Sequence, residues 1–246
     1  MAAEQIKEAM ANGAEEINFD VASVVFELVR IPEGTFFMGS PLQEEGRQPI
    51  EGPMRAINLS KPFYMGRYAI TQAQYQVVTG MNPSSFRGET LAMDQVLYSD
   101  ALEFCSRLSQ LSGIKVTLPT EAQWEYACRA GAQTRFYSGD SIADLDAIGW
   151  YVDNSGERVH EVGQKDPNAW GLYDMSGNVW EPTLDWLPSY ETMANTDPVG
   201  SITERGGAMR GGGRMHEAQY CRSASRLRCS NMFGGMGIRI VINPDG

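Results

Sequence analysis

The hydrophobic and polar residues in the first quarter of the chain follow patterns typical of short helices and strands. About the first twenty residues place apolar side chains on one side and acidic ones elsewhere, which predicts an acidic amphipathic helix. From Val24 to Phe37, β-branched and aromatic residues predict two strands around a turn at residues 32–34. A loop rich in proline and glycine is expected to follow, ending near Pro62.

Three helices are expected next. The first begins after Thr71, whose hydroxyl can accept a hydrogen bond from an exposed backbone N–H, and ends at Gly80. The second runs over about residues 99–112. The third opens at Thr120, and its Trp124 is expected in the core.

Regular periodicity fades beyond Gly131. Glycine, asparagine, aspartate and proline recur every few residues to about Gly213, which predicts loops held in place by buried aromatic side chains. The candidates for this role are Trp150, Trp170, Trp180 and Trp186.

Composition narrows the classes of protein and partner. The 246 residues, 42% hydrophobic and 21% charged, suit one globular unit with a substantial core. A formal net charge of −11 argues against a nucleic-acid partner, because an acidic surface repels phosphate. Arginines nevertheless cluster over residues 205–239, where a surface or ion-pair role is expected.

The chain shows no signal for a membrane or an oxidising compartment. It has no run of about 18 apolar residues, so no membrane span is expected. The first residues lack the basic start and apolar stretch of a secretory signal, which favours the cytoplasm, or the cell surface if a leader precedes this sequence. The four cysteines lack the spacing of a disulfide framework or a zinc site.

Five motifs carry a family resemblance. They are IPEGTFFMGS (31–40), FYMGRYAITQAQYQ (63–76), LPTEAQWEYACRAG (118–131), GLYDMSGNVWE (171–181) and RGGGR (210–214). Together they resemble the formylglycine-generating enzyme, or sulfatase-modifying factor, family over about residues 28–242. The resemblance implies an α+β, loop-rich C-type-lectin-like fold with few short helices and small antiparallel sheets. We therefore expect this domain over residues 28–246, after an N-terminal acidic helical extension over residues 1–27.

The resemblance also shows where the family enzyme's chemistry would lie. It implies a copper-binding cysteine pair after an RGGS-like turn, and aligning that turn on residues 210–213 puts His216 at the first position and Cys221 at the second. Copper(I) prefers soft thiolate donors, and two-coordinate binding needs both. We therefore expect neither copper nor catalytic residues, and oxidation of a substrate cysteine is disfavoured. The related iron sulfoxide synthases need three histidines, and this chain has two.

The GNVWE motif over residues 177–181 has two readings. The family binds calcium near this motif, and Asn178 and Glu181 are hard oxygen donors of the kind calcium requires. However, Pro182 stands where the family usually has a second tryptophan, and the upstream acids that would complete a site are not evident. The alternative is that both side chains tie the loop together through hydrogen bonds.

The last segment mixes two kinds of residue. Small residues and arginines are expected to hold the backbone: Gly211, Gly212, Ala218, Cys221, Arg222, Ala224, Arg226, Gly237 and Arg239. Between them stand the candidate ligand-binding residues Arg214, Met215, His216, Glu217, Gln219, Tyr220, Ser225, Leu227, Arg228, Ser230, Asn231, Met232 and Phe233. Their chemical variety suits a binding face for a protein or other macromolecular ligand. The arrangement also resembles the variable proteins of diversity-generating retroelements, which vary a C-terminal segment between RGG, CR and GFR-like landmarks; here the last is GIR.

Three functions follow from these patterns. The leading hypothesis is a noncatalytic, lectin-like ligand-binding protein, hypervariable if the retroelement resemblance holds, with an exposed face over residues 213–233. The alternatives are a divergent formylglycine-generating oxidase and a structural or regulatory module. The oxidase is disfavoured because His216 replaces a cysteine that the oxidation needs. A structural or regulatory module would be disfavoured if residues 213–233 formed one exposed face.

Overall fold

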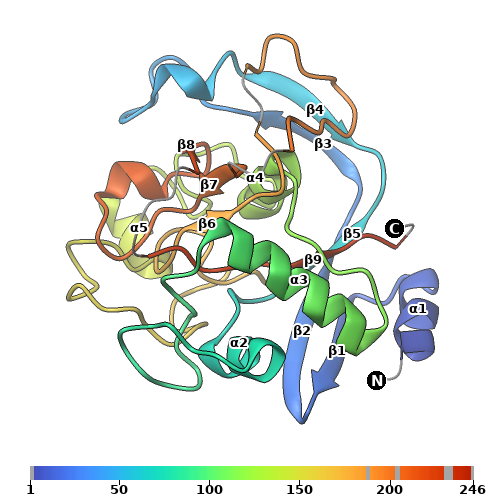
Figure 1. Cartoon of the computed structure of the whole chain (residues 1–246). Helices are drawn as coiled ribbons and strands as arrows, with labels where there is room; N and C mark the ends of the chain where they lie inside the picture. Colours follow the sequence, from blue (N-terminus) through green and yellow to red (C-terminus); the bar gives the residue numbers. More distant parts are fainter. Residues whose placement is uncertain (1–2, 187–188, 203–205, 230–234, 245–246) are drawn as a thin grey trace.

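The computed structural model describes residues 3–186, 189–202, 206–229 and 235–244. Its helices are α1 (Ala3–Ala11), α2 (Gln72–Thr79), α3 (Tyr98–Ser112), α4 (Glu121–Arg129) and α5 (Ile142–Ile148), with short 3-10 turns η1 (Pro49–Glu51) and η2 (Ala218–Cys221). Its strands are β1 (Glu16–Val21), β2 (Val24–Ile31), β3 (Gly34–Met38), β4 (Arg55–Leu59), β5 (Phe63–Gly66), β6 (Glu181–Pro182), β7 (Ala208–Arg210), β8 (Leu227–Arg228) and β9 (Val241–Ile242). Figure 1 shows their arrangement.

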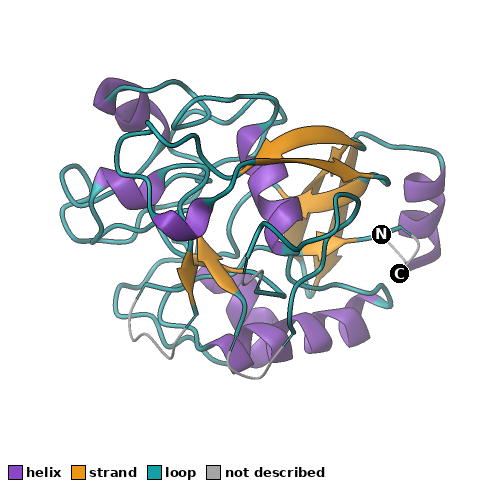
Figure 2. Cartoon of the chain, turned by 90° about the horizontal axis from the view of Figure 1, so that it is seen from above, coloured by secondary structure: helices purple, strands orange, loops and turns teal. Residues whose placement is uncertain are grey.

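The strands form three small antiparallel sheets. One has the order β1-β2-β5-β9, the second pairs β3 with β4, and the third has the order β6-β7-β8. Figure 2 shows the longer strands gathered on one side of the molecule, with loops and short helices on the other. This is the α+β, loop-rich architecture that the motifs imply. Among the described helices, none is long and apolar enough to cross a membrane.

The expectation of one helix over the first twenty residues is wrong. Helix α1 ends at Ala11, and Glu16–Val21 forms β1, which pairs along its whole length with β2. The physical reason is a two-residue period: Ile17 and Phe19 are buried, whereas Glu16, Asn18 and Asp20 are exposed. Ile6 of α1 packs in the same core, and the boundary expected after residue 27 falls inside β2.

The three expected helices are confirmed, with their caps. The Thr71 hydroxyl accepts a hydrogen bond from the Gln74 N–H at 3.2 Å, and the Gln74 side chain accepts one from the Thr71 N–H at 2.9 Å. Thr120 and Gln123 repeat this reciprocal arrangement at the start of α4. Gly80 ends α2 in the left-handed conformation, with φ of 79°.

The four-stranded sheet separates two hydrophobic clusters because successive strand residues point to opposite faces. In β2, Phe26 and Leu28 face the cluster that holds α2 and α3, whereas Val29 and Ile31 face the cluster that holds α4. Trp124 lies fully buried in the second cluster. Trp180 is buried in the first, as expected. The other three tryptophans expected to be buried among the loops, Trp150, Trp170 and Trp186, are only half-buried.

Candidate functional site

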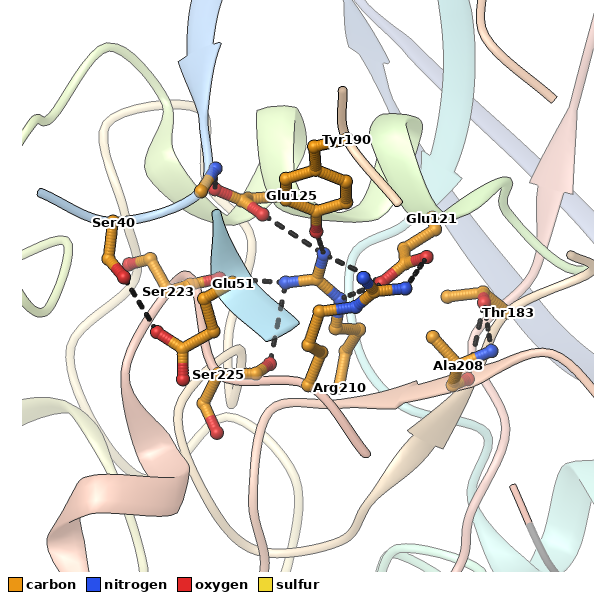
Figure 3. Close-up of polar contacts among 12 residues, drawn as sticks. Ser40, Glu51, Glu121, Glu125, Thr183, Tyr190, Ala208, Arg210, Ser223 and Ser225 are labelled. Carbon is orange, nitrogen blue, oxygen red and sulfur yellow. Dashed lines mark hydrogen bonds and ion pairs between the residues drawn. The ribbon is translucent and has the colours of Figure 1, made fainter. Parts of the chain in front are cut away.

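Arg210, at the end of β7, is the centre of a buried ion-pair cluster (Figure 3). Its Nη2 lies 3.0 Å from a carboxylate oxygen of Glu121 and 3.0 Å from one of Glu125, both on α4, and donates to the Tyr190 hydroxyl at 3.0 Å. Burial alone would raise the pKa of Glu125, but Arg129 and Arg210 outweigh it and the pKa is lowered. The strand that leads into the RGGG turn is therefore fixed to α4 by charge-assisted hydrogen bonds.

Two further arginines hold the C-terminal segment against a loop far away in the sequence. Arg222 is fully buried and pairs with Glu51 at 2.6 Å and with Glu44 at 2.7 Å. Arg226 donates to the carbonyl oxygen of Ile50 at 3.0 Å and to Glu121 at 2.7 Å. The backbone-holding role expected for Arg222 and Arg226 is confirmed, and the arginine cluster serves buried ion pairs.

Glu181 is part of the same kind of cluster. Its carboxylate accepts a hydrogen bond from the Trp124 indole N–H at 2.6 Å and pairs with Arg239 at 2.8 Å. The Arg239 guanidinium also donates to the carbonyl oxygens of Gly66 and Tyr173, each at 2.7 Å. Both oxygens of Glu181 are therefore occupied by protein donors.

Asn178 has protein partners as well. Its side-chain oxygen accepts from the His160 N–H at 3.0 Å, and its amide donates to the His160 carbonyl at 3.3 Å. Among the described residues, no group of three histidine, cysteine, aspartate or glutamate side chains is arranged to hold a metal ion. These contacts do not fit a calcium ion at Asn178 and Glu181, and they correspond to the alternative in which both side chains tie the loop together.

The two residues aligned with the family's copper-binding cysteines, His216 and Cys221, lie in different surroundings. His216 is half-buried, and its ring accepts a hydrogen bond from the Trp180 indole N–H, 3.2 Å from Nδ1. Burial and the nearby Arg214 lower the pKa of His216, which favours the neutral acceptor form. Cys221 lies in an apolar cluster with Phe136 and Tyr151, among others, and burial raises its pKa to about 12. The donors do not fit a copper pair, because copper(I) prefers two soft thiolates and the first position holds the imidazole of His216.

The candidate ligand-binding residues divide by exposure. Met215, Glu217 and Arg228 are exposed, Met215 to 58%. Four others are half-buried and reach the surface in part: His216, Gln219, Tyr220 and Leu227. Ser230, Asn231, Met232 and Phe233 lie outside the described residues.

Two predicted binding residues, Arg214 and Ser225, are buried, so the prediction is wrong for both. Arg214 turns back after the glycine turn, and its guanidinium lies 3.1 Å from the buried carboxylate of Asp94 and 3.3 Å from the carbonyl of Glu157. Ser225 lies beside Arg210, which donates to its carbonyl oxygen at 3.4 Å (Figure 3). Both residues belong to the support beneath the face, and not to its contact surface.

The surroundings of the face include segments that sequence reasoning missed. A Cβ added to Gly46 would lie 2.8 Å from the Gln219 Cβ, so the loop over residues 41–51 packs directly against η2. On another side, the Val152 N–H donates to the His216 carbonyl at 3.1 Å. These segments are distant in sequence from 213–233, and no local pattern in either of them marks the contact.

Asp174, in the GLYDMSGNVWE motif over residues 171–181, is a buried carboxyl without an ion-pair partner among the described residues. One of its oxygens accepts from the Gly163 N–H at 2.8 Å, and the other has no hydrogen-bond partner. Burial, opposed by that hydrogen bond and by Arg239, raises its pKa from 3.8 to about 6. Its charged form therefore destabilises the fold.

We expect Asp174→Asn to raise the free energy of unfolding at pH 8 by about 2–3 kcal/mol, the equivalent of about two pKa units. Below the unfolded-state pKa of 3.8 the carboxyl is protonated in both states, and between 3.8 and about 6 the unfolded chain ionises first. The wild type therefore loses stability as the pH rises through that window, whereas the variant does not. Denaturant titrations at pH 4 and pH 8 measure this, and an equal stability of the two proteins at pH 8 would contradict it.

The sequence matches the family model of the sulfatase-modifying factor enzyme 1-like domain over residues 15–244. The chain belongs to this family. The match begins at β1, ahead of the start near residue 28 that the motifs suggested. Among curated relatives, the formylglycine-generating enzyme of Bos taurus is 32% identical over 269 residues, covering 83% of this chain and 69% of the bovine protein. The chain spans about two thirds of the length of the curated relatives that it matches first.

Two solved structures of similar size superpose on nearly the whole family domain. Treponema denticola variable protein 1 matches with a TM-score of 0.83 and 26% identity, covering 93% of this chain and 99% of the other. PvdO from Pseudomonas aeruginosa matches with a TM-score of 0.81 and 26% identity, covering 92% and 98%. The family assignment, the fold and the resemblance to retroelement variable proteins are confirmed by these similarities.

Proposed function

We propose that this protein is a noncatalytic ligand-binding protein whose contact surface is the exposed part of residues 213–233. The proposal rests on one observation: the C-terminal segment separates buried residues, which support the backbone, from exposed ones. Arg210, Arg222 and Arg226 are buried and ion-paired, while Met215 and Glu217 between them are exposed. A fixed support beneath chemically varied, exposed side chains is what a recognition surface needs, because its contact residues can change without loss of the fold.

The partner is proposed to be a protein or another macromolecule. The described part of the face combines exposed or half-buried methionine, glutamate, tyrosine and arginine side chains. Side chains of this kind contribute strongly to the energy of protein interfaces. The net charge of −11 disfavours a nucleic acid.

Diversification of this face is the finer part of the proposal. Its support is the structural similarity to Treponema denticola variable protein 1, together with the RGG, CR and GIR landmarks around residues 210–239. The test is the genomic DNA beside the gene. A near-repeat of the 3′ end of the gene, differing at adenines and next to a reverse transcriptase gene, would establish diversification, and its absence would remove this part while leaving the binding face.

A direct assay separates binding from family catalysis. We expect no conversion of a sulfatase-type cysteine peptide to formylglycine, with or without added copper, because His216 stands where the second thiolate donor is needed. Mass spectrometry of the peptide after incubation measures the conversion, and Cys221→Ser is the matched control. Aldehyde formation that disappears in Cys221→Ser would contradict the noncatalytic proposal.

A further inference from the structure

The contacts of β4 determine which edge of β3 each of its main-chain N–H and C=O groups faces. Strand β4 pairs with β3 on one side, and on its other side the Asn58 N–H donates to Asn195 at 2.7 Å and the Asn58 carbonyl accepts from Asp197 at 2.9 Å. Successive residues of a strand direct their main-chain groups to opposite edges. Asn58 therefore points away from β3, and its partner Thr35 points away from β4.

The same alternation places the N–H and C=O groups of Thr35 and Phe37 on the outer edge of β3. Gly39, the next residue in this series, confirms the direction: its N–H donates to Glu125 at 2.8 Å and its carbonyl accepts from Arg129 at 2.9 Å, both on α4. Helix α4 therefore covers this edge at Gly39. Within the described part of the chain, the main-chain groups of Thr35 and Phe37 make no hydrogen bond outside the pairing of β3 with β4.

A cavity of about 210 Å³ lies beside this uncovered edge. Its walls include Phe37, which is 48% exposed, and the rings of Tyr126 and Trp170, which meet edge to face with centroids 4.8 Å apart. Arg129 also lines it, but its guanidinium is already bound by Glu125 and by the carbonyls of Gly39 and Thr134. The cavity therefore favours binding of an apolar or aromatic group over binding of an anion.

We propose that the outer edge of β3 binds an extended peptide segment of a partner protein by strand addition, with one apolar or aromatic side chain in the adjacent cavity. Unpaired main-chain groups at alternate residues provide affinity for an extended backbone, and a pocket beside them selects a side chain. The chain carries a net charge of −11, so a basic residue next to the apolar one is favoured. No residue of this site belongs to the C-terminal face, so it would be a second site.

Amide hydrogen exchange of the whole chain, followed by NMR, tests the edge and its occupant together. In the free protein, the amides of Thr35 and Phe37 should exchange faster than those of Phe36 and Met38, which face β4. The probe is a blocked peptide, acetyl-Lys-Val-Phe-Val-Lys-amide. At saturation it should slow exchange at Thr35 and Phe37 by at least about tenfold, and the same peptide N-methylated at alternate residues should not.

Two variants separate the edge from the cavity. Thr35→Pro removes one outer N–H but no bond to β4, and the preceding Gly34 has no Cβ to clash with the proline ring. The fold should therefore persist while the peptide binds at least about tenfold more weakly. Trp170→Ala removes a cavity wall and should weaken binding of the phenylalanine peptide more than of an alanine analogue. Equal binding of the N-methylated peptide would overturn the proposal. So would protection of Thr35 and Phe37 that rises with protein concentration alone, because it would mean that a second copy occupies the edge.

Discussion

Replacing Arg210 by methionine is expected to lower the free energy of unfolding by about 3–5 kcal/mol. The substitution keeps the length of the side chain but removes the positive charge between Glu121 and Glu125, both of which are fully buried. Two carboxylates would then share a site from which water is excluded, with Arg226 still paired to Glu121 and Arg129 still paired to Glu125. Chemical denaturation monitored by tryptophan fluorescence measures the loss.

The matched control for this change is Arg228→Ala. Arg228 lies in the same C-terminal segment but is exposed, so we expect its removal to change the stability by less than about 1 kcal/mol. A small effect of Arg210→Met, similar to that of the control, would mean that the buried cluster does not hold the segment in place.

The second large effect is expected for Trp124→Ala, at about 3–5 kcal/mol. The ring is fully buried, and a Cβ added to Gly211 would lie 3.2 Å from its Cζ2, so the ring packs against the RGGG turn. Its indole N–H also donates to Glu181, and removing it leaves a buried carboxylate with one donor fewer. The thermal or chemical unfolding midpoint reports the change.

Trp124→Phe divides the effect into its two parts. Phenylalanine retains most of the packing but not the N–H, so we expect a loss of about 1–3 kcal/mol from the unsatisfied Glu181. If phenylalanine restored the full wild-type stability, the hydrogen bond to Glu181 would contribute nothing, and packing alone would explain the role of the tryptophan.

Local sequence signals predicted the helices well and the N-terminus poorly. The caps at Thr71 and Thr120 depend on side chains within three residues, so their hydrogen bonds can be read from the sequence. In β1, only Ile17 and Phe19 mark the two-residue period, and two residues cannot distinguish a strand from the continuation of an amphipathic helix. Pairing with β2 decided the outcome.

The candidate site was predictable only where residue type fixed the environment. Small residues and arginines of the last segment were expected from their residue type to support the backbone, and Arg222 and Arg226 do so through buried ion pairs. The supporting role of Arg214 and Ser225 was not predicted, because their burial depends on contacts with Asp94 and Arg210 outside their local sequence. The packing of residues 41–51 against η2 depends on the pairing of Arg222 with Glu44 and Glu51, and no motif in that loop indicates it.

The central claim is that the exposed face can change without affecting the support beneath it. Replacing Met215, Glu217, Gln219 and Arg228 together by alanine tests this most directly, with the free energy of unfolding as the measurement. We predict that the free energy of unfolding changes by less than about 1 kcal/mol, because these side chains are exposed or half-buried. A loss as large as the one expected for Arg210→Met would contradict it, because the face would then be part of the structural core and not a surface for recognition.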